Sequence, residues 1–133
     1  MSDQGVEEVF SAPRSERLRE LLDADRIGTL QQISALSREY EAIVEANALV
    51  AIDDEHDPEG ASTAFERAHV AALLSQAREH LDDLDRALER LAEGDCGRCE
   101  QCGELIPMER LEVRPAARTC VRCAPAARGR GRG

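Results

Sequence analysis

Two pairs of cysteines constrain most strongly what this chain can fold into. Cys99 and Cys102 form one CxxC pair, and Cys120 and Cys123 form a second pair after seventeen intervening residues. Four thiolates at this spacing can converge on one tetrahedral zinc ion, because the short turn of each pair aims both of its sulfurs at a common point. The segment between the pairs has too few apolar side chains to fold unaided. Zinc would therefore supply most of the free energy that folds this module.

A fifth cysteine, Cys96, leaves the identity of the metal open. With Cys99 and Cys102 it forms a CxxCxxC run, a spacing that can begin an iron–sulfur site. We favour one structural Zn²⁺, since four cysteines already complete a zinc site. Cys96 is then either a spare thiol near the metal or a redox thiol that exchanges into the site when oxidised.

The composition favours long solvated helices over a thick globular core. Charged residues make up 33% of the 133 residues, and aromatic residues make up 2%. All five cysteines lie within 28 residues, which indicates metal binding in a reducing compartment rather than secreted disulfides. No apolar run reaches the roughly 18 residues of a membrane span, and the N-terminus lacks the basic start and apolar run of a signal peptide. We therefore expect a cytoplasmic protein that does not enter a membrane.

The formal net charge of −10 limits the choice of partner. A chain this acidic is repelled by a phosphate backbone, so the zinc module is not expected to read DNA sequence. A protein partner with a basic surface is the better expectation.

Two heptad patterns predict a long antiparallel helical hairpin. The first pattern steps by three and four residues along one helix face: Ile33, Leu36, Tyr40, Ile43, Asn47 and Val50. The same spacing returns later in the chain: Val70, Leu74, Ala77, Leu81, Leu84, Leu88 and Leu91. Two such seams on one chain can close on each other as a coiled coil. At 1.5 Å per residue, the hairpin would project roughly 40 Å.

The segment between the two seams is strongly acidic. Its carboxylates are Asp53, Asp54, Glu55, Asp57 and Glu59. Pro58 and Gly60 favour a turn, and Ser62 or Thr63 can cap the second helix. This acidic tip, residues 53–62, is either a solvated connector or an electrostatic probe for a cationic or metal-bearing pocket.

The fold class is therefore mainly α, a long antiparallel coiled-coil hairpin with a small C-terminal four-cysteine zinc finger. Near the N-terminus, Leu18, Leu21 and Leu22 form a short apolar stripe that should dock on another element, and Gly28 and Thr29 would interrupt its helix. Four parts are expected: an N-terminal arm with a short helix at 1–29, the hairpin at 30–93, the four-cysteine finger at 94–124 and a disordered Arg-Gly tail at 125–133.

This order of elements resembles the DksA/TraR family of bacterial RNA-polymerase-binding proteins. The hairpin runs into CxxCG, then IPxxRL, a proline and a second CxxC. The matching residues are Gly94, Gly97, Cys99, Cys102, Gly103, Ile106, Arg110, Leu111, Pro115, Ala117, Cys120 and Cys123. The resemblance covers about residues 30–124. The Asp-Pro-Glu-Gly tip and the arginine-rich zinc module are similar to versions from high-GC Gram-positive bacteria.

The resemblance implies a transcription regulator that binds RNA polymerase and inserts its hairpin into the secondary channel to modulate initiation. The tip residues near the polymerase active site would be Asp57, Asp54, Asp53 and Glu59, with Asp57 as the first candidate. The resemblance also suggests a monomer that does not bind promoter DNA.

The sequence bears on two other functional classes, an enzyme and an interaction adaptor. Four cysteine ligands leave no open metal position and no nucleophile–base set is evident, so we expect no enzymatic activity. The alternative is a zinc-stabilised protein–protein interaction adaptor that does not act through the polymerase channel. An adaptor that uses the flank of the hairpin should tolerate Asp57→Ala.

Overall fold

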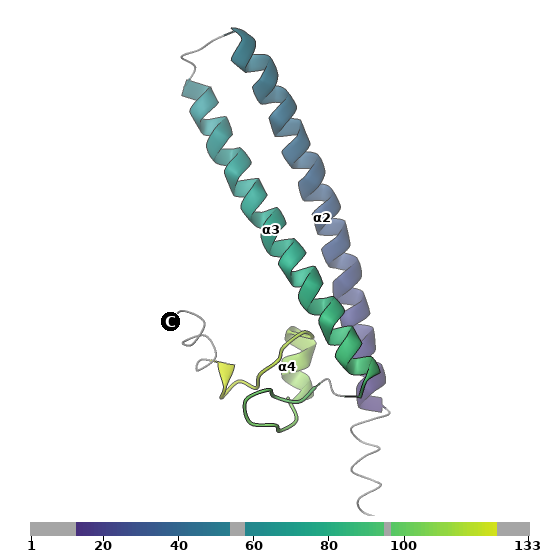
Figure 1. Cartoon of the computed structure of the whole chain (residues 1–133). Coiled ribbons are helices and arrows are strands. Elements are labelled where there is room, and N and C mark those ends of the chain that lie inside the picture. The colour runs from purple at the N-terminus through teal and green to yellow at the C-terminus, as the bar shows by residue number, and fades with distance from the viewer. Residues whose placement is uncertain (1–12, 54–57, 95–96, 125–133) are drawn as a thin grey trace, which may run out of the picture. The chain divides into compact units, whose positions relative to one another are not determined.

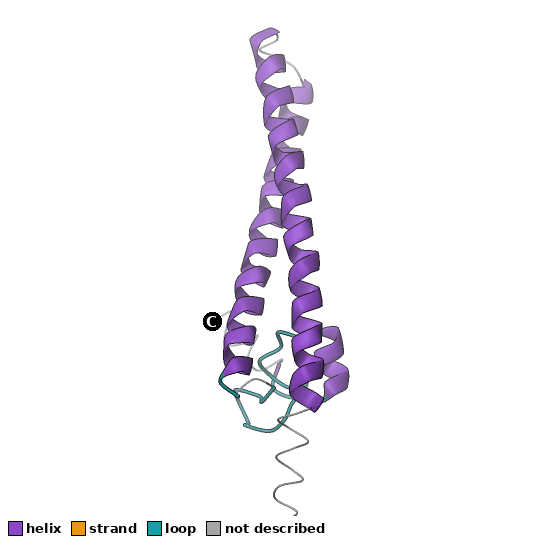
Figure 2. Cartoon of the chain, turned by 90° about the vertical axis from the view of Figure 1, so that its right-hand side faces the viewer, coloured by secondary structure: helices purple, strands orange, loops and turns teal. Residues whose placement is uncertain are grey.

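A computed structural model describes residues 13–53, 58–94 and 97–124 of the chain. Its helices are α2 (Pro13–Asp53), α3 (Pro58–Ala92) and the short α4 (Met108–Val113). The described residues contain no strand, only an isolated bridge between Arg98 and Leu105. Figures 1 and 2 show α2 and α3 side by side in both views, running in opposite directions. The predicted mainly α fold with a long helical hairpin is confirmed. None of the described helices is long and apolar enough to cross a membrane.

The chain separates into two compact units. The hairpin unit is Ile27–Asp82, and the finger unit combines Met1–Arg26 with Asp83–Gly133. Both long helices contribute residues to both units. The predicted hairpin at 30–93 therefore includes a final part of α3 that belongs to the finger unit.

The two heptad seams supply the buried apolar residues described in the hairpin unit. Its buried apolar residues are Ile43, Val70, Leu74 and Ala77, all of them at predicted seam positions. Other seam residues of α2, such as Ile33, Leu36 and Tyr40, are only half-buried. A pair of helices covers each seam from one side only, so few side chains lose all contact with water. This unit therefore depends on many partial burials rather than on a central core.

Helix α2 runs without a break through Gly28 and Thr29, where the sequence suggested an interruption. That expectation is wrong, and the helix expected in residues 1–29 is continuous with the hairpin. A glycine inside a helix costs about 1 kcal/mol relative to alanine. Packing of the residues before and after Gly28 offsets this cost, because Leu22 is fully buried and Thr29 is only 4% exposed.

The tip is shorter than the predicted range of 53–62. Helix α2 continues to Asp53, and α3 already begins at Pro58, so the expected serine and threonine caps lie inside α3. Proline suits the first turn of a helix because its missing N–H would have no intrahelical partner there. Only residues 54–57 lie between the two helices.

Gly28→Ala should raise the free energy of unfolding of the zinc-loaded protein by about 0.5–1 kcal/mol. Gly28 is helical, its φ is not positive, and an added Cβ would meet no atom within 4 Å. The matched control is Gly94→Ala, which should destabilise the protein, because Gly94 also faces open space but has a φ of +81°. Urea denaturation followed by circular dichroism measures both. A Gly28→Ala protein that is no more stable than wild type would contradict a regular helix at this point.

Candidate metal centre

One apolar core holds the finger unit together. Its buried residues are Leu18, Leu22, Leu84, Ala87, Leu91, Cys99, Ile106, Leu111 and Cys120. Leu18 and Leu22 come from α2, so the apolar stripe predicted near the N-terminus packs against α3 and the finger. Cys99 and Cys120 are also predicted metal ligands. The metal site is thus continuous with the core that joins the two long helices.

The first cysteine pair lies on a tight backbone turn. The Gly103 N–H donates to the Cys99 carbonyl at 2.8 Å, and the Cys99 N–H donates to the Glu104 carbonyl at 2.8 Å. Gly103 has a φ of +77°, a region that L side chains rarely adopt. The turn therefore favours a glycine at the position that follows the pair.

The second cysteine pair is held by its own turn and by an arginine. The Cys123 N–H donates to the Cys120 carbonyl at 3.1 Å. Arg110, on α4, donates from Nε to the Thr119 carbonyl at 2.8 Å, immediately before this pair. The two pairs are also joined directly, because the Glu100 N–H donates to the Arg118 carbonyl at 2.8 Å.

These turns bring all four predicted ligands together. The sulfur atoms of the cysteines lie within 4.8 Å of one another: Cys99, Cys102, Cys120 and Cys123. The Sγ atoms of Cys102 and Cys120 are 3.9 Å apart. Zn–S bonds of about 2.3 Å in a tetrahedron place the sulfurs about 3.8 Å apart. The four cysteines therefore fit one Zn²⁺, whose role is structural because all four positions are occupied by protein.

The surrounding backbone favours the thiolate form of two ligands in the metal-free chain, because backbone hydrogen bonds lower the pKa of Cys99 and that of Cys120. Burial works to raise the pKa of Cys99, but backbone hydrogen bonds from Cys120, Cys102 and Gln101 together lower it to about 6. Hydrogen bonds from the neighbouring thiols of Cys120 and Cys99, together with burial, raise the pKa of Cys123 to about 12. At neutral pH, zinc binding must therefore displace a proton from the Cys123 thiol, whereas Cys99 is already mostly a thiolate.

Arg14 is a site residue that sequence reasoning did not identify. Its guanidinium, on the first turn of α2, donates to the carbonyl oxygen of Ile106, and lies 3.5 Å from the carbonyl oxygen of Gly97. Arg14 thus ties α2 to both ends of the first turn of the finger. The contact spans 92 positions, so no local pattern could have revealed it.

The remaining predicted site residues are placed only in part. Asp53 ends α2, and Glu59 lies in the first turn of α3. Asp54, Asp57 and Cys96 lie outside the described residues, so the roles of the tip carboxylates and of the redox thiol stay predictions.

The fold and the site together define a class of protein in which a two-helix hairpin is joined to a four-cysteine zinc finger. The family model of the prokaryotic dksA/traR C4-type zinc finger matches residues 94–127. Residues 94–127 are therefore similar to the C4-type zinc finger of DksA/TraR proteins, and the resemblance expected from the sequence is supported for this part of the chain.

Two curated relatives match over part of the chain. The protein YteA of Bacillus subtilis is 41% identical over 66 residues, which cover 50% of this chain and 28% of YteA. The RNA polymerase-binding transcription factor DksA of Caulobacter vibrioides is 39% identical over 57 residues, which cover 43% of this chain and 40% of that protein. The chain thus spans less than half the length of these relatives.

A solved structure matches over nearly the whole chain. The transcription factor DksA2 from Pseudomonas aeruginosa is similar with a TM-score of 0.55 and 29% identity, covering 96% of this chain and 98% of that one. The similarity extends well beyond the finger and includes the hairpin.

The zinc affinity should fall as the pH falls, and the dependence should steepen below about pH 6. Protons compete with zinc for the thiolates, and below its pKa of about 6 Cys99 must also release a proton when zinc binds. Competition with a chelator of known zinc affinity between pH 8 and 5 measures this. A plot of log Kd against pH that does not steepen through pH 6 would contradict the backbone stabilisation of Cys99.

Proposed function

We propose that this chain binds RNA polymerase and regulates transcription initiation, with the acidic end of its hairpin inserted into the secondary channel. The observation that carries the proposal is the combination of a two-helix hairpin and a four-cysteine finger, together with the likeness to DksA2 over nearly the full length of both chains. The relative from Caulobacter vibrioides is named an RNA polymerase-binding transcription factor, which supports the same partner.

The hairpin unit has the dimensions and charge that this role requires. At 1.5 Å per residue, α2 extends about 40 Å from Ile27 to Asp53. The chain between and beside the helix ends carries five carboxylates: Asp53, Asp54, Glu55, Asp57 and Glu59. A narrow pore that leads to a catalytic magnesium ion favours an anionic ligand, because low-dielectric walls focus the positive potential.

Within this proposal, the parts of the chain have separate roles. Asp57 is the first candidate to act near the polymerase active site, and the zinc site keeps the bases of α2 and α3 together. The Asp57–Gly60 sequence supports a protein of the high-GC Gram-positive type. The protein would act in the cytoplasm as a monomer, without sequence-specific DNA binding.

Asp57→Asn should leave the affinity for polymerase within about twofold of wild type. The change that the protein causes in the lifetime of promoter complexes should become at least about fivefold smaller. The substitution removes one charge of the tip and leaves the packed seams untouched. The matched control is Glu79→Gln, which removes the same charge from an exposed position on α3 and should change neither property. Affinity and lifetime are measured with purified polymerase of the host bacterium. An Asp57→Asn protein with a full effect would contradict a role for this carboxylate.

The adaptor remains the alternative because the flank of the hairpin unit exposes apolar side chains. Phe65 on α3 is 79% exposed, and Val44 on α2 is 39% exposed. Isolated exposed apolar residues are common, so this observation is weaker than the full-length likeness to DksA2. The adaptor alternative predicts that the chain does not bind polymerase. Its binding to another protein should then be lost in Phe65→Ser and kept in Asp57→Asn.

A further inference from the structure

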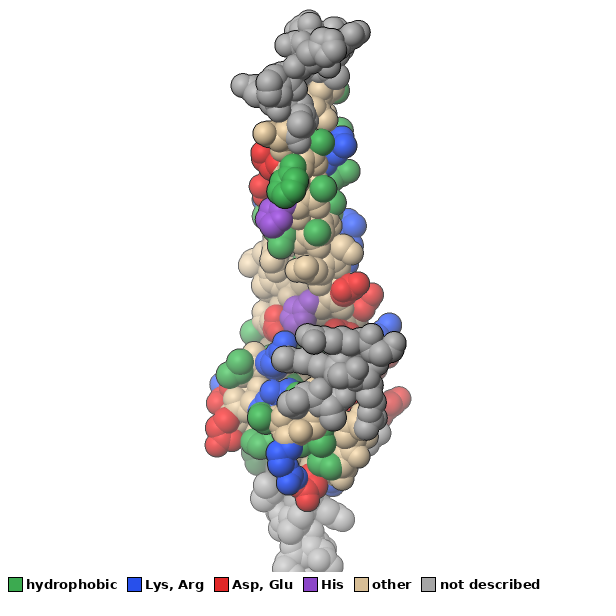
Figure 3. Space-filling view, turned by 90° about the vertical axis from the view of Figure 1, so that its left-hand side faces the viewer, with side chains coloured by type: hydrophobic (Ala, Val, Ile, Leu, Met, Phe, Trp, Pro, Cys, Tyr) green, Lys and Arg blue, Asp and Glu red, His purple; other side chains and the backbone are tan. Residues whose placement is uncertain are grey.

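The arginines of the finger unit fall into two groups. Most of those that the structure describes are exposed, and Figure 3 shows several arginine side chains on one face of this unit. Four of the described arginines of the unit are half-buried: Arg14, Arg26, Arg90 and Arg110. Arg26 pairs with the carboxylate of Asp85 at 2.7 Å. Arg14 and Arg110 instead donate to backbone carbonyl oxygens close to the cysteine pairs, so they can position the metal ligands.

Arg14 lies on the closed end of the backbone loop that carries the first cysteine pair, here called the first cysteine loop, residues 97–106. The Ile106 N–H donates to the Gly97 carbonyl at 2.8 Å and closes this loop. The guanidinium of Arg14 donates to the carbonyl oxygen of Ile106 and lies 3.5 Å from that of Gly97. A Cβ added to Gly97 would lie 3.7 Å from Nη2 of Arg14. The guanidinium therefore contacts the two residues that close the loop.

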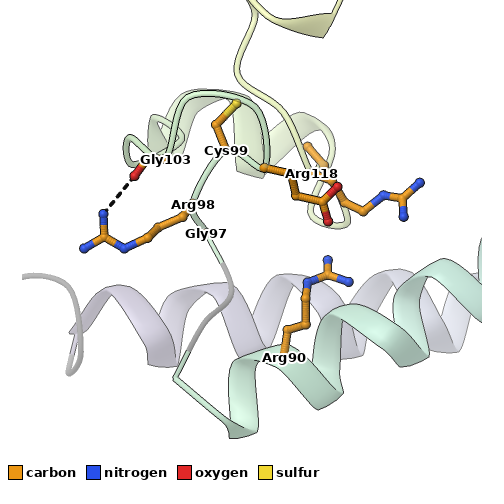
Figure 4. A pocket seen from close by; sticks show the side chains of 8 residues that line it. Arg90, Gly97, Arg98, Cys99, Gly103 and Arg118 are labelled. Carbon is orange, nitrogen blue, oxygen red and sulfur yellow. Dashed lines mark hydrogen bonds between the residues drawn. The ribbon is translucent and has the colours of Figure 1, made fainter. Parts of the chain in front are cut away.

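The first cysteine loop presents its metal ligand on the side away from the long helices. Figure 4 shows Gly97 on the side of the loop nearer these helices, and the sulfur of Cys99 points to the opposite side. Arg98 donates to the Gly103 carbonyl at 3.0 Å, but this exposed contact joins two residues of the loop itself. Arg14, by contrast, joins the loop to α2.

The second cysteine pair is held from within the finger. Nε of Arg110 donates at 2.8 Å to the carbonyl of Thr119, the residue directly before Cys120. Arg110 belongs to α4, which lies between the two pairs in the sequence. Arg14 belongs to the first turn of α2, and the ends of helices open at a lower free energy than helix interiors. The first pair therefore depends on a segment that opens more readily.

We propose that Arg14 is a positioning residue for the metal site, which holds the first cysteine pair in place and makes zinc retention by this pair depend on the first turn of α2. Arg110 has the same role for the second pair. Hydrogen bonds from a guanidinium are charge-assisted and about twice as strong as neutral ones. Residues that orient metal ligands without touching the metal typically change its affinity about 10–100-fold when they are replaced. When the first turn of α2 opens, the first pair should thus release zinc before the second.

The test is alkylation of the zinc-loaded full chain with iodoacetamide, at a dose at which few molecules react more than once. Mass spectrometry gives the rate at each cysteine, and the ratio of variant to wild type cancels the intrinsic reactivity of each thiol. In Arg14→Gln, the cysteines of the first pair should react at least about tenfold faster than in wild type. Those of the second pair should react less than about twofold faster, because Arg110 still holds them. Zinc content and circular dichroism confirm that the variants are folded.

Three further variants make the test specific. Arg110→Gln is the reciprocal change and should accelerate the second pair more than the first. Arg17→Gln is the matched control, since it removes the same charge from an exposed position of α2 that pairs with Glu112 at 3.2 Å. It should change neither pair more than about twofold. Arg14→Lys keeps the charge but loses the planar fork of donors. Its first-pair rates should lie between those of wild type and Arg14→Gln, and it replaces Arg14→Gln if that variant does not fold.

The two cysteine pairs give the experiment its two outcomes. Selective acceleration of the first pair in the Arg14 variants supports the positioning role. Equal acceleration of both pairs would overturn it, because Arg14 would then only stabilise the fold in general. Rates unchanged from wild type would overturn it as well. All of these measurements use the protein alone, so the result does not depend on the function proposed above.

Discussion

The whole structure depends on the packing of metal ligands inside the core that joins the helix ends. Cys99 and Cys120 are buried together with Leu18 and Leu22 of α2 and with α3 residues such as Leu84. Besides these cysteines, the finger contributes only Ile106 and Leu111 to the buried part of this core, so zinc and the helices stabilise each other. A long helical hairpin has only a seam to hold it, and the core of the finger unit adds a second contact between residues of the same two helices.

Local patterns were sufficient to predict most of the fold. The step of three and four residues predicted the seams, and Val70, Leu74 and Ala77 are buried as expected. The CxxC spacing predicted the metal site because ligand convergence is set by turns only a few residues long. Both inferences rest on the spacing of residues that are close in sequence, which is why they needed no knowledge of the fold.

The errors and omissions came from contacts between residues far apart in sequence. Gly28 looks like a helix break, but the helix is held from both sides, by Leu22 in one unit and by the seam in the other. Pro58 is a local exception: it was expected within a turn but begins α3, since proline is equally suited to the first turn of a helix. Arg14 could not be recognised at all, because its carbonyl partners lie on the finger.

The proposed function requires the acidic end of the hairpin to reach the interior of RNA polymerase. The most direct measurement is a photo-crosslink from a probe replacing Asp57, with core polymerase of the host bacterium and a probe replacing the exposed Glu109 of α4 as control. We expect the Asp57 probe to crosslink to segments lining the secondary channel or the active site and the Glu109 probe not to do so. Crosslinks from Asp57 confined to the outer surface of the polymerase, or none despite binding, would contradict it.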